Sequence, residues 1–206
     1  MVWGGSTSVG CNAIQLAVAA GYGVITTCSP RNFEKMARLG ARAAFDYNSP
    51  TVVADIVAAL RGHRLAGAFA IGTGSMAALL DIVGACPGAK FIASASQPAA
   101  FNVPASGRVS TLSLLPTLVR MTIGNARLGR KARRLGIRTK FIWGSSLQDN
   151  EVGPMIFARF LPQALADGRY AAAPEPLVVG HGLETIPKAL EQLGKGVSAR
   201  KLVVTL

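Results

Sequence analysis

Short apolar runs alternate with longer amphipathic segments along the first half of the chain. The short runs are typical of buried strands, and the longer segments are typical of helices that cover a sheet. Strands are predicted at residues 1–3, 24–28, 43–47, 66–71 and 90–94, with helices at 11–17, 33–39, 50–60 and 76–85 between them. This alternation predicts an α/β fold built on a doubly wound parallel sheet.

The pattern is less regular in the second half of the chain. Between residues 95 and 136, three prolines and Gly107 predict a long connection that contains one helix within 118–135. A sixth strand is expected at 140–144 and a helix at 150–166. A proline-rich stretch at 173–176 precedes a strand at 177–179, a short helix at 183–193 and a last strand at 201–206.

The beginning of the chain is the strongest candidate for a binding site. An apolar strand end passes through Gly4, Gly5 and three hydroxyl residues into a helix, so the backbone can approach a pyrophosphate closely. The free N–H groups and the positive dipole end of that helix also favour a phosphate. The spacing is Gly4-x-x-Thr7-x-x-Gly10 instead of G-x-G-x-x-G, which leaves an ordinary strand-to-helix connection as the alternative.

The first strand is short for its expected place in the sheet. In an open parallel sheet the strand that carries this turn is central, and strands usually have about five or six residues. Only three residues precede Gly4. We therefore expect that the chain begins inside its central strand and that it corresponds to part of a longer protein.

The end of the second predicted strand suggests which nucleotide the chain prefers. Dinucleotide-binding folds that take NADH usually place an Asp or Glu there, on the ribose hydroxyl. This chain instead has Ser29, Pro30, Arg31 and Asn32. Hydroxyl, guanidinium and amide groups can all donate to a 2′-phosphate, so the segment favours NADPH. The alternative is that Asn32 caps the next helix and Arg31 is solvated.

The composition argues against a membrane protein and against a metal-binding protein. No apolar run is long enough to cross a bilayer, and no leader precedes the first strand, so we expect a soluble cytoplasmic chain. The three cysteines and two histidines show no metal-binding spacing, and no metal is expected. Cys11, at a helix start, has either a lowered pKa or the role of a small packing residue.

The formal net charge of +12 is concentrated in one segment. No acidic residue lies between Asp81 and Asp149, while eight basic residues lie between Arg120 and Lys140. Such a basic segment attracts nucleic acid, an acidic carrier protein or a phosphorylated cofactor. It lacks interleaved aromatic residues that would stack on bases, which favours a solvated basic face and makes nucleic acid an unfavoured partner.

Four stretches together resemble the zinc-independent branch of the medium-chain dehydrogenases/reductases. They are WGGSTSVG at 3–10, TCSPRNF at 27–33, FDY at 45–47 and GVSARKLVV at 196–204. Within this branch the resemblance is strongest to the NADPH-dependent enoyl reductases that act in trans with fungal polyketide synthases. The likeness covers most of the chain and is poor between residues 95 and 138.

The resemblance implies how the chain is organised. In this family a Rossmann-type cofactor domain lies between two pieces of a GroES-like catalytic domain. Residues 1–176 would then be the NADP-binding Rossmann domain, and residues 177–206 the C-terminal remnant of the catalytic domain. The larger N-terminal piece would be lacking, together with most residues that orient the substrate.

The resemblance also implies a set of cofactor-binding residues. Gly5, Ser6, Thr7, Ser8 and Val9 would form the pyrophosphate turn; Ser29, Pro30, Arg31 and Asn32 the 2′-phosphate clamp; Tyr47 would lie by the adenosine, and Arg200 would reach the cofactor phosphates. Many relatives have an Asp where Ala70 stands.

The implied activity is hydride transfer from NADPH to the activated double bond of an enoyl, enone or carrier-bound acyl substrate, in a possible homodimer. No catalytic residue is identified. The alternatives are a fragment of a zinc-type alcohol dehydrogenase and a nucleotide- or nucleic-acid-binding protein without catalytic activity.

Overall fold

The computed structural model describes residues 1–96 and 111–206, with only the backbone of residues 111–118. Two compact units are distinguished: the first comprises Met1 and Pro50–Ile142, and the second comprises Val2–Ser49 and Trp143–Leu206. The long connection expected from the prolines falls largely on residues 97–110, which lie outside the described part.

The N-terminal part of the second unit is a β-α-β-α-β arrangement. Its elements are β1 (Val2–Trp3), α1 (Ser8–Ala19), β2 (Val24–Thr27), the 3-10 turn η1 (Pro30–Asn32), α2 (Phe33–Arg38) and β3 (Ala41–Phe45). β2 runs parallel to both β1 and β3. The buried side chains of Ile14, Val24 and Met36 come from α1, β2 and α2, and they belong to the apolar core of this part.

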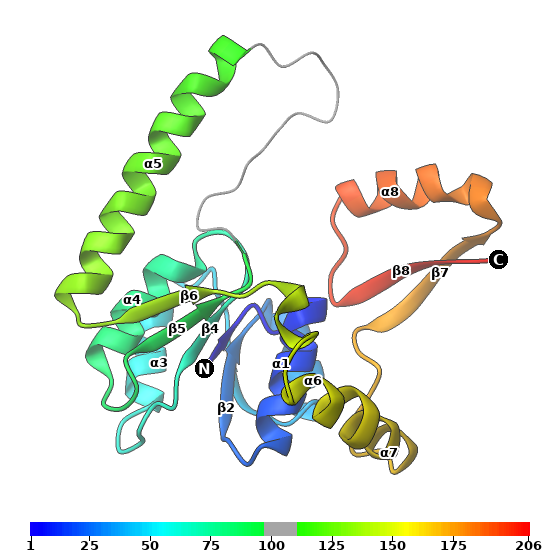
Figure 1. The fold of residues 1–206 in the computed structure, drawn as a ribbon, viewed down its shortest axis with the longest axis horizontal. Helices are drawn as coiled ribbons and strands as arrows, with labels where there is room; N and C mark the ends of the chain where they lie inside the picture. The colour runs from blue at the N-terminus through cyan, green and yellow to red at the C-terminus, as the bar shows by residue number, and fades with distance from the viewer. Residues whose placement is uncertain (97–110) are drawn as a thin grey trace. The chain divides into compact units, whose positions relative to one another are not determined.

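The C-terminal part of the same unit begins with short helical pieces. They are η2 (Gly144–Leu147), α6 (Val152–Pro154), a π-helical turn η3 (Met155–Phe160) and α7 (Leu161–Ala166). Strand β7 (Glu175–His181) then pairs in parallel with β8 (Arg200–Thr205) in a separate two-stranded sheet, and η4 (Leu183–Thr185) and α8 (Ile186–Gly194) connect the two strands (Figure 1).

The segment before β7 is tied to α1 by hydrogen bonds. The Tyr170 hydroxyl donates to Asn12 Oδ1 over 2.6 Å. The Gln15 side chain bonds both backbone groups of Ala171, accepting from its N–H over 2.7 Å and donating to its carbonyl over 3.1 Å. These bonds hold the segment that precedes β7 against α1.

The first unit continues the α/β pattern. It contains α3 (Val52–Ala59), β4 (Ala68–Ala70), α4 (Ser75–Ala85), β5 (Phe91–Ser94), α5 (Thr111–Arg134) and β6 (Arg138–Phe141), and β4, β5 and β6 are parallel. Side chains of α4 fill its core, with Leu79 and Leu80 fully buried. The Lys90 ammonium donates to the carbonyls of Val83, Gly84 and Cys86 at the end of α4, where the helix dipole favours a cation.

The strand order of the main sheet is β3-β2-β1-β4-β5-β6. This is the order of dinucleotide-binding folds, and it confirms the predicted doubly wound parallel sheet. The two segments expected at 1–176 and 177–206 remain a prediction.

Most element boundaries differ from the sequence prediction by a few residues, among them those of β3, α5 and β6. β3 ends at Phe45, two residues early, because the Asp46 carboxylate accepts from the N–H of Asn48 and starts a turn. α5 begins at Thr111 and passes through Pro116, its sixth residue, which has no N–H to donate to the helix. β6 ends at Phe141, because residues 144–147 form the 3-10 turn η2.

Candidate functional site

The start of α1 is capped by Thr7. Its hydroxyl donates to the Gly4 carbonyl over 2.8 Å and accepts from the Gly10 N–H over 3.0 Å, while the Cys11 N–H donates to the Thr7 carbonyl. This hydroxyl is therefore fully engaged in the turn. The N–H groups of Ser8 and Val9 have no acceptor among the described residues, as expected for a first helical turn. The helix start can therefore receive an anion.

The glycines of the turn serve close packing. The N–H groups of Gly4 and Gly5 donate to the Thr27 side chain and carbonyl, at 3.0 and 2.9 Å, and so hold the turn against β2. A Cβ on Gly5 would meet Thr26 Oγ1, and a Cβ on Gly10 would meet the backbone of Gly4 and Gly5. Gly10 thus allows the helix to start directly against the strand end.

The end of β2 meets the C-terminal segment of the chain at Ser198. The Ser198 hydroxyl oxygen accepts from Arg31 Nε over 3.1 Å and from Asn32 Nδ2 over 3.0 Å. Asn32 is buried, whereas Arg31 is exposed. Beside them, the hydroxyls of Ser29 and Tyr47 lie 3.3 Å apart. No acidic side chain lies between Cys28 and Asn32.

A cavity of about 490 Å³ lies between these groups within the second unit. Among the residues that the structure describes, its basic side chains are Arg31, Lys195 and Arg200, and no carboxylate lines it. The Lys195 ammonium is paired with Glu191 at 2.7 Å, while Arg200 has no ion-pair partner in the described part. The complete lining is Ser6, Thr7, Ser8, Ser29, Arg31, Tyr47, Leu193, Lys195, Gly196, Val197, Ser198, Ala199 and Arg200. The cavity suits an anionic ligand.

The structure brings most of the predicted site residues to this cavity. Ser6, Thr7, Ser8, Ser29, Arg31, Tyr47 and Arg200 all line it. Gly5 is buried within the turn, Val9 is exposed on the first turn of α1, and Pro30 is the first residue of η1. Asn32 touches the site only through its bond to Ser198.

Sequence reasoning missed the loop from Lys195 to Ala199. The motif GVSARK at 196–201 predicts only Arg200, directly after this loop, as a cofactor-binding residue. A glycine between a helix and a strand, flanked by Lys195 and Arg200, was the available signal. Nothing in the spacing, however, shows that residues separated by 167 positions share a hydrogen bond.

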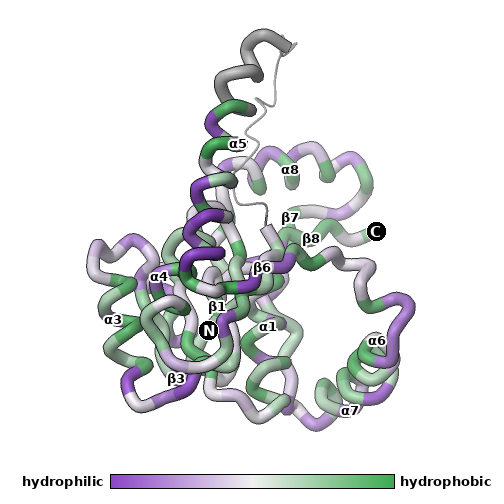
Figure 2. Tube along the Cα trace, turned by 60° about the vertical axis from the view of Figure 1, so that its left-hand side comes forward, coloured by the Kyte–Doolittle hydropathy of each residue, from purple (hydrophilic) through white to green (hydrophobic). Residues whose placement is uncertain are grey.

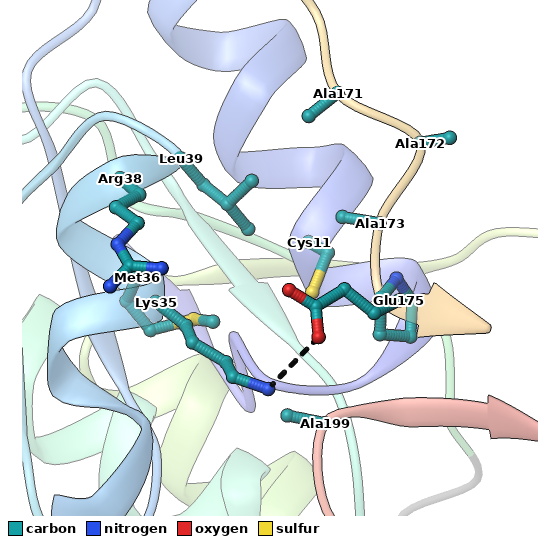
Figure 3. A pocket seen from close by; sticks show the side chains of 11 residues that line it. Cys11, Lys35, Met36, Arg38, Leu39, Ala171, Ala172, Ala173, Glu175 and Ala199 are labelled. Carbon is teal, nitrogen blue, oxygen red and sulfur yellow. Dashed lines mark ion pairs between the residues drawn. The ribbon is translucent and has the colours of Figure 1, made fainter. Parts of the chain in front are cut away.

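A second, smaller cavity of about 170 Å³ lies beside the Cys11 side chain, and Lys35 and Glu175 face each other across it at 3.8 Å (Figure 3). Burial raises the pKa of the Cys11 thiol. Burial, followed by the charges of Asp46 and Cys11, raises the pKa of Cys28 to about 11. The alternative of a lowered pKa at Cys11 is therefore wrong, and Cys11 is a small packing residue.

The basic segment is partly engaged in structural contacts. Hydrophilic residues recur along the described part of α5 (Figure 2). Lys131 forms an ion pair with Asp81 at 2.6 Å, and the Arg138 guanidinium lies 5.9 Å from the centre of the Phe91 ring. Among residues 1–96 and 111–206, no group of three His, Cys, Asp or Glu side chains is placed to hold a metal ion. In the same ranges, no helix combines the length and hydropathy of a membrane span.

Comparison with known proteins shows which enzymes the chain resembles. No protein-family model matches the chain. It is 45% identical over all of its residues to the dehydrogenase pigH of Monascus ruber, covering 54% of that protein. It is 30% identical, again over its whole length, to the trans-enoyl reductase himH of Aspergillus japonicus, covering 52% of it.

A solved structure shows the same fold. CurA from Vibrio vulnificus, determined in complex with NADPH, superposes with a TM-score of 0.64 at 20% identity, over 99% of this chain and 55% of CurA. The chain thus spans about half the length of the relatives it matches. In sequence the chain is therefore similar to dehydrogenases and trans-enoyl reductases over its whole length, and it shares the fold of CurA.

Proposed function

We propose that this chain is the NADPH-binding half of an enoyl or quinone reductase. The observation that carries the proposal is the cavity in which the start of α1, the end of β2 and the loop before β8 meet, with three basic side chains and no carboxylate. NADH-binding sites of this fold normally have an acidic residue at the end of β2. The donors present here suit a phosphorylated ribose instead.

The residues fit separate parts of the nucleotide. The open N–H groups of Ser8 and Val9, with the hydroxyls of Ser6 and Ser8, would hold the pyrophosphate at the positive end of α1. Thr7 would support this turn without contacting the phosphate through its hydroxyl, which is already bonded on both sides. Gly5 would keep the turn close to β2.

The adenosine end would lie toward η1 and β3. Ser29, Arg31 and Asn32 would form the 2′-phosphate clamp, with Pro30 setting the start of η1. Tyr47, half exposed beside Ser29, would lie along the adenosine, and Arg200 would add positive charge toward the phosphates. The guanidinium of Arg200 has no ion-pair partner among the described residues, which supports that assignment.

When bound, NADPH supplies a hydride for reduction of an activated double bond. The part of this chain is to bind and orient the nucleotide. We further propose that the substrate is an enoyl, enone or carrier-bound acyl compound, and that the protein acts in the cytoplasm as a homodimer. The trans-enoyl reductase name of himH supports the substrate class. No side chain in the described residues is assigned a catalytic role.

Isothermal titration calorimetry with NADPH and NADH tests the proposal. We expect the wild-type chain to bind NADPH more tightly than NADH. Replacement R31A should weaken NADPH binding about tenfold or more, because a charge-assisted hydrogen bond contributes about 1.5–3 kcal/mol, and should change NADH binding little.

The matched control is R61A, which removes an exposed arginine of the first unit outside the cavity. It should bind both nucleotides like the wild type. Equal affinity of the wild-type chain for the two nucleotides, or equal losses for both in R31A, would overturn the assignment of the clamp.

A further inference from the structure

We propose that Ser198 is a positioning residue that sets the preference for a 2′-phosphorylated nucleotide. This inference rests on the proposed function and adds a residue that neither the sequence motifs nor the comparisons assign. Its basis is a three-residue contact within the second unit. Ser198 Oγ accepts one bond from Arg31 and one from Asn32, and the Arg31 guanidinium itself lines the cavity.

The hydroxyl oxygen is saturated as an acceptor. A serine hydroxyl has two lone pairs and one proton. Arg31 Nε and Asn32 Nδ2 occupy the two lone pairs, and the hydroxyl proton has no acceptor among the described residues. Ser198 can therefore donate to an anion in the cavity while it continues to hold both clamp residues.

The bond from Arg31 Nε to Ser198 leaves the two terminal nitrogens of the guanidinium free to bind a ligand. A guanidinium has five N–H donors in a fixed plane, and only the Nε donor is used by Ser198. The terminal nitrogens remain available for a phosphate, which arginine commonly binds with two parallel bonds. Because Arg31 is exposed, this one bond restricts a side chain that would otherwise sample many rotamers.

The backbone around Ser198 holds the hydroxyl in place. Ala199 is buried and has a φ of 47°, in the left-handed region that non-glycine residues rarely adopt. Strained residues of this kind persist where the surrounding structure determines them, and they gather at ligand clamps. Immediately after Ala199, Arg200 pairs with Glu175 in the β7–β8 sheet. The sheet thus fixes the loop that presents Ser198.

It follows that Ser198 contributes to specificity without itself carrying a charge. Loss of the Ser198 hydroxyl should weaken the contribution of the 2′-phosphate and leave the rest of the nucleotide unaffected. A purely structural role would instead weaken both kinds of nucleotide to the same extent.

The experiment measures binding of two probes, adenosine 2′,5′-bisphosphate and adenosine 5′-monophosphate, by calorimetry on the whole chain. The probes differ only in the 2′-phosphate. S198A should reduce affinity for the bisphosphate about tenfold, as expected for loss of hydrogen bonds to charged groups, and leave the monophosphate unchanged. S198T, which keeps the hydroxyl, should restore the preference. S145A, an exposed serine outside the cavity, is the matched control.

The outcomes separate this inference from the proposed function. If the wild-type chain does not prefer the bisphosphate, the proposed function fails. If the wild type prefers it and R31A removes the preference, while S198A keeps it, only the role of Ser198 is overturned. Equal loss for both probes in S198A, or a failure of S198T to restore the preference, would likewise overturn it.

Discussion

Arg31 and Asn32 are neighbours in sequence but have different surroundings. Asn32 is buried and precedes α2, yet its side chain makes no capping bond to the helix and instead donates to Ser198. Arg31 is exposed and also donates to Ser198. The alternative in which Asn32 caps the helix and Arg31 is merely solvated therefore does not hold. Both side chains point toward the segment that closes the cavity.

Cys28 is buried and lies between the end of β2 and η1. Its side chain is completely inaccessible, and burial raises its pKa to about 11. The neutral thiol is therefore the form that the folded chain accommodates at ordinary pH. Ionisation would place a thiolate beside Asp46, which repels it.

This environment predicts a loss of stability at high pH. The pKa of Cys28 is raised in the folded chain. The contribution of its neutral thiol to stability is therefore fully present below the ordinary pKa of about 9, and it is lost as the pH rises toward 11. The free energy of unfolding, measured by urea denaturation, should fall by at most about 2 kcal/mol more in the wild type than in C28A across this window. Parallel pH dependence in the two proteins would contradict the assignment.

The N-terminal cap of α1 supports both the helix and the proposed binding site at its start. Thr7 holds both the Gly4 carbonyl and the Gly10 N–H, so one hydroxyl joins the end of β1 to the start of the helix. A helix with an unsatisfied first turn frays, and here fraying would disturb the N–H groups of Ser8 and Val9. The stability of the turn and its capacity to bind an anion therefore depend on the same residue.

We expect T7A to lower the free energy of unfolding by about 1 kcal/mol, the usual cost of losing a helix N-cap. T7S keeps the hydroxyl and should lose much less. Thermal and urea denaturation of the three proteins, without ligand, provide the measurement. An unchanged T7A, or equal losses in T7A and T7S, would show that the cap contributes nothing to the fold.

The elements of the sheet were largely predictable because each one is encoded locally. Buried strands such as Val24–Thr27 have β-branched residues, and glycines mark the ends of most helices. Strand ends were less predictable, because they depend on turns such as the one that the Asp46 carboxylate makes. The start of α5 does not follow from the sequence, because a proline such as Pro116 usually indicates the end of a helix.

At the scale of the whole molecule, the site depends on contacts between distant parts of the chain. That the turn before α1 and the end of β2 lie close together was predictable, because both belong to one β-α-β unit of known spacing. Lys195 and Ser198 were not, because their contribution arises only when β8 pairs with β7 and brings residues 195–200 against η1. A pairing of this range has no signature in local sequence.

The relatives are about twice as long as this chain. The chain spans about half of the dehydrogenase and of the trans-enoyl reductase it matches, and it contains the cavity in which we propose that NADPH binds. The function that this chain can be tested for on its own is therefore the binding of NADPH in this cavity.

Hydrogen–deuterium exchange of the whole chain with and without saturating NADPH tests this claim most directly. A ligand that binds the folded state slows exchange where it closes local openings. We expect slower exchange in peptides covering 4–10, 29–32 and 195–200, with no change in α3 (Val52–Ala59), whose residues do not line the cavity. Binding of NADPH without protection of 29–32 and 195–200, or no protection anywhere, would contradict the account.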